Sequence, residues 1–326
     1  MSKLALPQVT LCCVDTTGRI PSSLQALRHC LDKIEFGDAI LLTLPELLLD
    51  QKIPTGLRIV PIDPLKSIEA YSHFMVKSLF QFIETTHCLV VQWDGYVIHS
   101  RQWTPDFLAF DYIGAPWLHA DGSITVGNGG FSLRSKKLLN ALQSEAIVAQ
   151  HPEDACICTV YRSVLESQGI VFAPAELAQK FSVETGALSE YAFGFHGPHH
   201  LPHLLGPEEM VGFIESFSPE KILFSNLFDM LLRELTVSVR NDPAFRPALT
   251  ALVKLIHQAL NEFRHAAMQT EYSDAICKAL IRYGQYSAAA TLLKYRIEAS
   301  GVTWMNAKMY GRLAIYRLLN HVHVRR

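Results

Sequence analysis

The sequence has no apolar run long enough to cross a membrane and no signal peptide at its start. The longest apolar stretch, Ala39–Leu49, is interrupted by Thr43, Pro45 and Glu46, whereas a membrane-spanning helix needs about 20 apolar residues. Residues Met1–Thr10 contain one lysine and lack the apolar core of a secretory signal. We therefore expect a soluble protein of the cytoplasm without a transmembrane segment.

Neither sign of charge prevails in this chain. Its 326 residues include 29 Lys and Arg against 31 Asp and Glu, which gives a net charge of −2. Such a balance provides no overall positive field to attract nucleic acid or an anionic bilayer. We expect no nucleic-acid partner, and any polyanion that the protein binds has to be small and locally held.

Cysteine is scarce, and its spacing suits neither disulfides nor zinc. The seven cysteines are an odd number, and Cys12 and Cys13 are adjacent within an apolar run, where neighbours on a strand point to opposite faces. Cys156 and Cys158 form C-x-C, and no second pair completes a zinc knuckle. This pattern is typical of reduced thiols.

The apolar content, 49% of residues, is sufficient for one large or two ordinary folded domains. In the first half of the chain, short apolar runs alternate with segments of helical spacing, which predicts an α/β fold with a sheet between helices. We expect strands at Val9–Asp15, Ala39–Leu44, Leu57–Pro61 and Cys88–Gln92, and helices at Ser22–Ile34 and Ile68–Thr85.

The second half of the chain changes character twice. A stretch rich in Trp, Tyr and Gly, Tyr96–Leu133, precedes predicted helices at Ser135–Ala149 and Pro152–Ser167 and a closing strand at Ile170–Ala173. From about Pro207 only helical spacing remains, so we place a domain at residues 1–206 and an all-helical one at residues 207–326. Within the latter, residues 275–298 resemble one tetratricopeptide unit, or they are ordinary packed helices.

Polar residues that follow apolar strands are the first candidates for a site, because open α/β sheets bind ligands at the carboxyl ends of their strands. Asp15, Thr16 and Thr17 follow the first strand. The segment Gln92–Gly95, with Trp93 and Asp94 at its centre, follows the most apolar strand. Asp94 is either a ligand for a divalent cation that also holds a diphosphate or part of a simple Asp-Gly turn.

Three further segments carry residues suited to chemistry. The three glycines of Gly127–Arg134 permit close approach of a ligand to backbone amides, or they make a hairpin turn or bulge. Glu153 and Asp154 open a predicted helix, where a carboxylate both offsets the helix dipole and can serve as a general base. His196 stands between glycines and aromatic residues and is the histidine that we single out from the His-rich segment around it.

The order of these segments resembles an uncharacterised family of glycosyltransferase-like proteins marked by V-Q-x-D-G and G-N-G-G-F-S-L-R. The resemblance covers residues 9–197, and the G-N-G-G-F-S-L-R block is its most specific part. The matching runs are Val91–Tyr96, Tyr112–Trp117, Gly127–Arg134, Glu153–Asp154 and Phe193–Gly197.

The layout is also similar to the GT-A glycosyltransferase plan, a Rossmann-like mixed sheet flanked by helices. That resemblance implies that Asp94 and His196 bind a divalent cation, Mn²⁺ or Mg²⁺, and that Asp154 is the catalytic base. It implies a sugar or acceptor contact for Glu153. Gln92 stands where the plan has the first Asp of D-x-D, so one negative charge fewer faces the cation.

From this resemblance we predict a nucleotide-sugar-dependent, inverting glycosyltransferase of polysaccharide or glycoconjugate biosynthesis, acting on a glycan, lipid-linked or protein acceptor. The expected substrate contacts are Gln92, Glu153, Asn128, Gly129, Gly130 and the rings of Trp93, Tyr112 and Trp117, with Asp15, Thr16, Thr17, Tyr71 and Lys77 at the nucleotide. One alternative is an inactive sugar- or nucleotide-binding module whose helical tail recruits a partner protein. A nucleotidyltransferase is another, less well supported because Asp15–Arg19 is a poor match for its basic Gly-rich loop.

Overall fold

The computed structural model describes residues 3–119, 121–219, 227–262, 277, 278, 280–300, 309 and 311. The chain divides into two compact units, Met1–Gly197 and Pro198–Arg326. The change of character in the sequence had placed this boundary between residues 206 and 207.

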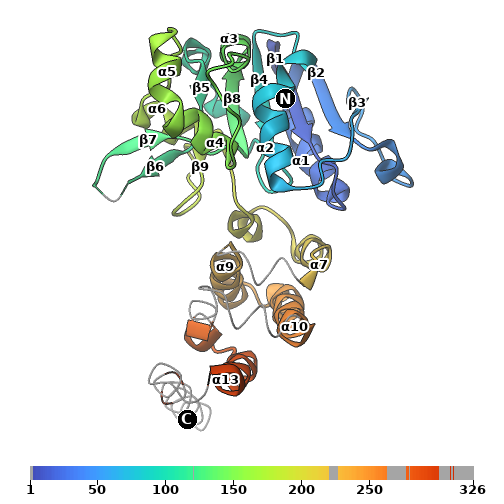
Figure 1. Ribbon diagram of the computed structural model, residues 1–326. Coiled ribbons are helices and arrows are strands. Elements are labelled where there is room, and N and C mark those ends of the chain that lie inside the picture. Colours follow the sequence, from blue (N-terminus) through green and yellow to red (C-terminus); the bar gives the residue numbers. More distant parts are fainter. Residues whose placement is uncertain are drawn as a thin grey trace. The chain divides into compact units, whose positions relative to one another are not determined.

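A six-stranded mixed sheet forms the centre of the first unit (Figure 1). Its strand order is β3-β2-β1-β4-β8-β5. The first four strands are parallel, and β8 runs antiparallel between β4 and β5. The strands are β1 (Leu4–Val14), β2 (Ile34–Thr43), β3 (Arg58–Pro61), β4 (His87–Val91), β5 (Tyr112–Ile113) and β8 (Phe131–Ser135). All of β4 and β8 is buried, as expected for strands that are covered on both faces.

Helices and two small ribbons complete this unit. The helices are α1 (Ile20–Lys33), α2 (Ile68–Lys77), α3 (Lys136–Ala141), α4 (Glu153–Ala155), α5 (Arg162–Ser167) and α6 (Ala175–Phe181), with the 3₁₀ turns η1 (Pro45–Leu48), η2 (Leu79–Phe82), η3 (Ser100–Gln102) and η4 (Pro105–Ala109). The ribbons pair β6 (Pro116–Leu118) with β7 (Ile124–Val126), and β9 (Ser182–Val183) with β10 (Gly194–Phe195). A mixed sheet flanked by helices is the predicted fold class, which is confirmed.

Two predicted helices are shorter than their apolar spacing indicates, and one contact links their ends. The helix expected over residues 68–85 ends at Lys77, and the helix expected over residues 135–149 ends at Ala141. The ammonium of Lys77 donates hydrogen bonds to the carbonyl oxygens of Leu142 and Ser144. Because these carbonyls bond the Lys77 side chain, a tertiary contact at the end of α3 competes with continuation of the helix.

Two other predicted elements differ in the structure. The helix expected over residues 152–167 is split into α4, the π-helical segment η5 (Cys156–Val160) and α5. The strand expected over residues 170–173 is reduced to a bridge between Phe172 and Tyr112, because its partner β5 has only two residues to pair with.

An aromatic cluster beneath the sheet fixes the segment that carries His196. Trp103 and Phe107 pack edge to face, with ring centroids 5.4 Å apart, and Phe181 and Phe193 extend the cluster to Phe131 at the start of β8. The space that a side chain at position 194 would need is filled by the ring of Phe131. The glycine there lets β10 lie against this cluster, two residues before His196.

The described part of the second unit is helical and has no strand. It comprises η6 (Pro198–His203), α7 (Pro207–Glu215), α9 (Leu227–Asn241), η7 (Pro243–Phe245), α10 (Arg246–Glu262) and α13 (Tyr286–Ser300). Residues 275, 276 and 279 of the tetratricopeptide-like segment lie outside the described residues, so that resemblance stays a prediction. Among the described helices of both units, none is long and apolar enough to pass through a bilayer.

Candidate active site

The glycine-rich turn at the start of β8 brings the separate candidate segments together. Val91 at the end of β4 pairs with Phe131, so Asp94 follows β4 close to the turn Asn128–Gly130. A Cβ atom at position 130 would overlap the His196 imidazole, and one at position 129 would overlap the Glu153 carboxylate. Residues that are far apart in the sequence therefore pack against one turn.

The backbone amides of this turn are bonded within the protein. Asn128 has a positive φ of +67°, and its side-chain Oδ1 accepts from the N–H of Gly130 at 3.0 Å. The N–H of Gly129 donates to Asp154 Oδ2 at 2.9 Å. The sequence left open whether these amides meet a ligand or belong to a turn, and in this structure they fix the turn and hold Asp154 against it. Asn128 Nδ2 is buried and makes no hydrogen bond within the described residues.

His196 lies between two carboxylates. Its Nε2 is 3.5 Å from Asp94 Oδ1, and its Nδ1 is 3.5 Å from Glu184 Oε1. Burial alone would lower the pKa of His196, but the charges of Asp94 and then Glu184 outweigh it and raise the pKa to about 10. Without a cation the imidazole is therefore protonated at neutral pH.

Asp94 and His196 are two residues of this region that could supply ligands to a divalent cation. Asp94 is 2% exposed, and its Oδ1 is a buried oxygen that accepts no hydrogen bond. Within the described residues, no group of three His, Cys, Asp or Glu side chains is arranged to hold a metal on its own. A Mg²⁺-type cation is commonly bound by one or two carboxylates and completes its shell with water and substrate phosphates; Asp94 would supply one carboxylate, and His196 would add a nitrogen ligand.

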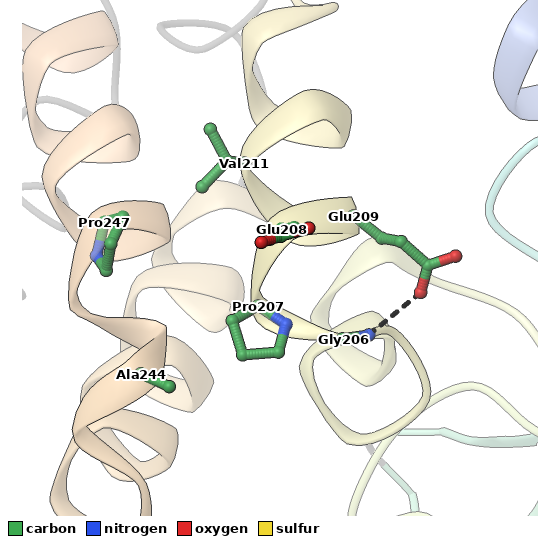
Figure 2. Close-up of a pocket in the computed structure, with 7 residues that line it drawn as sticks. All are labelled: Gly206, Pro207, Glu208, Glu209, Val211, Ala244 and Pro247. Carbon is green, nitrogen blue, oxygen red and sulfur yellow. Dashed lines mark hydrogen bonds between the residues drawn. The ribbon is translucent and has the colours of Figure 1, made fainter.

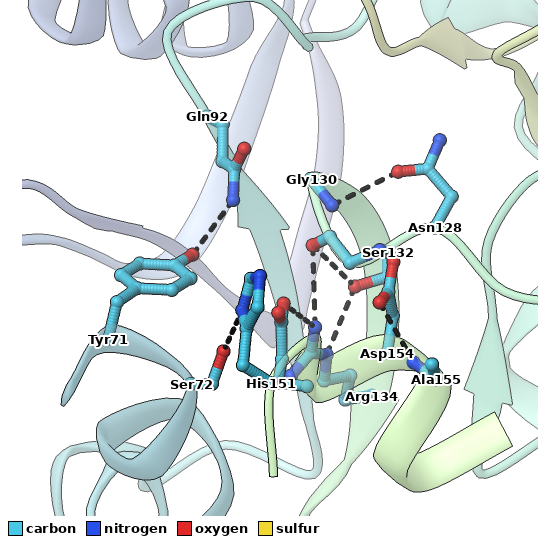
Figure 3. A network of polar contacts seen from close by, with 12 residues as sticks. Tyr71, Ser72, Gln92, Asn128, Gly130, Ser132, Arg134, His151, Asp154 and Ala155 are labelled. Atoms are coloured by element: carbon cyan, nitrogen blue, oxygen red, sulfur yellow. Dashed lines mark hydrogen bonds and ion pairs between the residues drawn. The ribbon is translucent and has the colours of Figure 1, made fainter. Parts of the chain in front are cut away.

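Arg134, which Figure 3 shows beside Ser132, forms a buried ion pair with Glu153 next to the turn. The guanidinium Nη2 is 3.4 Å from Glu153 Oε1, and Arg134 also donates to Ser132 Oγ and to the carbonyl oxygen of Gly129. Burial raises the pKa of Glu153, and Arg134 opposes that rise. Arg134 also lies 5.6 Å from the ring of Tyr112.

Asp154 is half-buried beside this pair, and its carboxylate has acceptor positions left for further hydrogen bonds. Its Oδ2 accepts from Gly129 and its Oδ1 from the N–H of Ala155 at 2.8 Å. A carboxylate has about four acceptor positions on its two oxygens, so two remain. Of the two acids that open α4, Asp154 is the accessible one, and Glu153 is 6% exposed and paired.

Two residues that follow β4 contact side chains at the helices: Gln92 contacts Tyr71 on α2, and Trp93 contacts Arg19 just before α1. Gln92 donates from Nε2 to the hydroxyl of Tyr71 on α2 at 2.9 Å, as Figure 3 shows. The guanidinium of Arg19 lies 4.2 Å from the ring centre of Trp93. Burial lowers the pKa of Arg19, an effect that the nearby Asp94 and Asp15 oppose. Arg19 thus places a positive charge near Asp15 and Asp94, the acids that follow β1 and β4.

The predicted nucleotide contacts differ in how much of each side chain is free of bonds within the protein and so able to contact a ligand. Asp15 accepts from the N–H and hydroxyl of Thr17 and from the hydroxyl of Ser23, so its role is to shape the loop before α1. Thr16 accepts from the N–H of Leu65, and Thr17 is exposed. Lys77 donates to carbonyls at the end of α3, as described above, which ties it to that helix rather than to the loop after β1.

The three predicted aromatic contacts also differ in how exposed their rings are. The ring of Tyr112 is completely buried, which disagrees with the prediction that it faces a sugar. Trp117 is half-buried; its ring fills the space beside Gly127, and its indole N–H donates to Glu184 Oε2 at 3.0 Å. Trp93 is half-buried beneath Arg19.

Sequence reasoning missed three residues of this region. Arg134 lies inside the G-N-G-G-F-S-L-R block, and a charged residue within an apolar strand was a signal that could have identified it. Arg19 closes the loop after the first strand, where a basic residue is suited to an anionic ligand. Glu184 follows a two-residue strand, and nothing in the sequence near it points to His196.

A cavity in the second unit contains none of the predicted site residues. It has a volume of about 580 Å³ and lies between α7 and the start of α10 (Figure 2). The Glu209 carboxylate accepts there from the N–H of Gly206 at 3.0 Å and so satisfies the start of α7. The lining is formed by Gly206, Pro207, Glu208, Glu209, Val211, Ala244 and Pro247.

Comparisons with known proteins give a family match and several structural likenesses, two of which follow. The chain is similar to the mannosyltransferase PcManGT from Pyrobaculum calidifontis in complex with GDP-Man and Mn²⁺, with 10% identity, a TM-score of 0.36 and coverage of 98% of this chain and 90% of that one. It is similar to TarS 1–349 from S. aureus, with 10% identity, a TM-score of 0.28 and coverage of 91% and 93%. No curated protein matches the sequence. Residues 55–196 match the model of a protein family of unknown function, DUF5672.

Proposed function

We propose that this protein is a glycosyltransferase that takes its sugar from a nucleotide-sugar donor, with the help of a divalent cation, and moves it to a hydroxyl group of a glycan or glycoconjugate. The observation that carries the proposal is the packing of two acidic centres on one turn. His196, next to Asp94, packs against Gly130, and Glu153 and Asp154 contact Gly129.

The two centres match the two demands of sugar transfer. The attacking hydroxyl is a weak nucleophile and needs a base, and the departing diphosphate is an anion that needs positive charge. Asp154 is the candidate base, because it is accessible and the Gly129 amide orients it. A divalent cation bound by Asp94 and His196 would offset charge on the diphosphate.

In the proposed reaction, the acceptor oxygen forms a bond to the anomeric carbon while the bond from that carbon to the diphosphate oxygen breaks. The proton of the acceptor hydroxyl passes to Asp154. A single displacement of this kind inverts the configuration of the sugar. Glu153 is held by Arg134 at the base of the turn and keeps Asp154 in place, because the two acids are adjacent at the start of α4.

The donor nucleotide is proposed to lie along the edge of the sheet between β1 and β4. Thr16 and Thr17 follow β1, and Tyr71 faces that edge through its hydrogen bond to Gln92. Arg19 adds a guanidinium in the field of Asp15 and Asp94, and guanidinium groups bind phosphate oxygens through paired N–H donors.

One observation favours a second candidate, a binding module without activity. The amide of Gln92 is occupied by Tyr71 and adds no charge beside Asp94. A site with one carboxylate fewer holds a cation more weakly, so a protein with this site could bind a nucleotide sugar without turning it over.

Calorimetric titration with UDP, GDP and their sugar derivatives, with and without Mn²⁺, followed by a donor-hydrolysis assay, separates the two candidates. The transferase proposal expects Mn²⁺-dependent binding and turnover. It also expects Asp154→Asn to lower turnover by about 10²-fold or more while donor binding stays near the wild-type level. Binding without turnover in the wild type would favour the module, and full turnover in Asp154→Asn would refute the assignment of the base.

A further inference from the structure

A chain of side-chain contacts runs from one end of the glycine-rich turn to the other through Glu184. The ring of Trp117 fills the space beside Gly127, and the imidazole of His196 fills the space beside Gly130. Glu184 lies between these two rings. Its Oε2 accepts from the indole N–H of Trp117 at 3.0 Å, and its Oε1 lies 3.5 Å from Nδ1 of His196. The contacts therefore form a closed loop that begins and ends at the turn.

Backbone pairing fixes the segments that carry these side chains. Trp117 pairs with Thr125 in the ribbon of β6 and β7. The strands β9 and β10 pair in parallel, and directly after them the N–H of His196 donates to the carbonyl oxygen of Val183 at 2.9 Å. Glu184 follows Val183 in the chain. Its carboxylate is thus delivered to the imidazole by a paired backbone and not by a free loop.

The two ring nitrogens of His196 face different carboxylates. Nε2 lies 3.5 Å from Asp94 Oδ1, whereas Nδ1 faces Glu184 Oε1. Nδ1 is buried and makes no hydrogen bond within the described residues, so its polar contact is the ion pair with Glu184. Because Glu184 and Asp94 face different nitrogens, Glu184 reaches a cation beside Asp94 through the imidazole and is not itself placed as a ligand.

This arrangement is typical of a histidine that binds a metal. Such a histidine ligates through one ring nitrogen and usually directs the other to a carboxylate, a backbone carbonyl or water. The outer contact fixes the orientation of the ring and so decides which nitrogen faces the metal. Glu184 occupies that outer place for His196, and Trp117 in turn orients Glu184. Without the carboxylate, the ring would be less restrained and Nε2 would be held less firmly beside Asp94.

We propose that Glu184 is a positioning residue: together with Trp117 it holds the imidazole of His196 so that Nε2 faces Asp94 and can bind the divalent cation. The inference rests on the proposed function for the cation itself. It concerns the orientation of one side chain, however, and is tested without any transfer of sugar.

The test uses the full chain with Mn²⁺ and inorganic pyrophosphate, which supplies diphosphate oxygens and contains no nitrogen. Electron spin-echo spectroscopy of the Mn²⁺ detects a coordinated imidazole nitrogen, and calorimetric titration gives the Kd. The wild type is expected to show the nitrogen signal, and His196→Gln is expected to lack it. Glu184→Ala is expected to lose the signal and to raise the Kd by about tenfold or more.

Two milder variants keep the inference testable if Glu184→Ala does not fold. Glu184→Gln retains an oxygen that can accept from Nδ1, so it is expected to keep the nitrogen signal and to lose less affinity than Glu184→Ala. Trp117→Phe leaves a ring beside Gly127 but removes the indole N–H. It is expected to raise the Kd by about fivefold, as for the loss of one hydrogen bond.

Glu190→Ala is the matched control, because it removes the same charge from an exposed position between the same two strands. It is expected to keep the nitrogen signal and the wild-type Kd. In a His196→Gln background, Glu184→Ala is expected to change the Kd no further, because a positioning residue acts through the ring that has been removed. A direct effect of the Glu184 charge on the cation would persist in that background.

The inference is overturned if the wild type gives no nitrogen signal, or if Glu184→Ala keeps both the signal and the Kd of the control. It is also overturned if the loss of affinity in Glu184→Ala persists in full without the imidazole. Turnover of a nucleotide sugar alongside any of these results would leave the proposed transferase standing. A nitrogen signal that depends on Glu184, in a protein that neither binds nor hydrolyses a nucleotide sugar, would support the inference and refute the proposed function.

Discussion

Arg134→Met tests whether the buried ion pair holds the turn in place. The side chain of Arg134 is 0% exposed, and that of its partner Glu153 is 8% exposed. Methionine is close to arginine in length and unbranched, so it fills much of the same space without a charge. The substitution therefore leaves the Glu153 carboxylate buried and uncompensated, which typically costs about 3–5 kcal/mol.

The cost is expected to depend on pH, with a sign that follows from protonation. Burial without the arginine leaves the pKa of Glu153 above its unfolded value of about 4.3. A carboxyl group with a raised folded pKa stabilises the protein most when protonated, below the unfolded pKa, and loses that contribution as pH rises through the folded pKa. The variant is therefore expected to be closest to the wild type near pH 4.5 and furthest from it near pH 8.

Urea unfolding followed by tryptophan fluorescence measures this loss. Three of the four tryptophans, Trp93, Trp103 and Trp117, lie in the first unit, and Trp304 lies in the second, so most of the signal comes from the part of the chain that carries the pair. The double variant Arg134→Met, Glu153→Gln is expected to be more stable at pH 8 than Arg134→Met alone. A loss below about 1 kcal/mol that is the same at both pH values would refute the reasoning, as would simple additivity of the two single changes.

Three further predictions concern the residues around the pair. Gly130→Ala should abolish Mn²⁺-dependent nucleotide binding in calorimetry, because its methyl group displaces His196, whereas Gly212→Ala, which meets nothing within 4 Å, should not. The stability of the wild type relative to His196→Gln should be greatest below pH 6.5 and should fall as pH rises through about 10. The fall should be at most about 5 kcal/mol, because each unit of pKa corresponds to about 1.4 kcal/mol. A difference in thermal unfolding between the two proteins that does not change with pH would contradict this prediction. Lys77→Met should cost about 1–3 kcal/mol in urea unfolding and leave nucleotide affinity unchanged, because its ammonium bonds the end of α3.

The features that the sequence predicted best depend on local pattern. The apolar runs that become β4 and the later parts of β1 and β2 were recognisable because strands buried on both faces need continuous apolar residues. Asp94 was singled out because it follows the carboxyl end of β4. In both cases the information is contained within a few consecutive residues.

The features that the sequence did not predict depend on contacts between distant residues. The early end of α2 is associated with carbonyl groups some 65 residues away that bond Lys77. The sequence indicated that Tyr112 faces a ligand. In the structure it is buried, because its two-residue strand lies beside β8. Glu184 has no local signal at all, since its importance comes from the two side chains that reach it from β6 and from the end of β10.

The glycine-rich turn shows how an expected role can move from one atom to another. The sequence offered two reasons for the glycines there, the approach of a ligand to bare amides or a hairpin turn or bulge. In the structure the amides of Gly129 and Gly130 are bonded to Asp154 and Asn128, and the space beside these glycines is filled by Glu153 and His196. The lack of side chains at Gly129 and Gly130 thus makes room for the Glu153 carboxylate and the His196 imidazole. Any ligand would be recognised by the groups that the turn positions, so a substitution at these glycines should act through Asp154 and His196 and not through a lost amide contact.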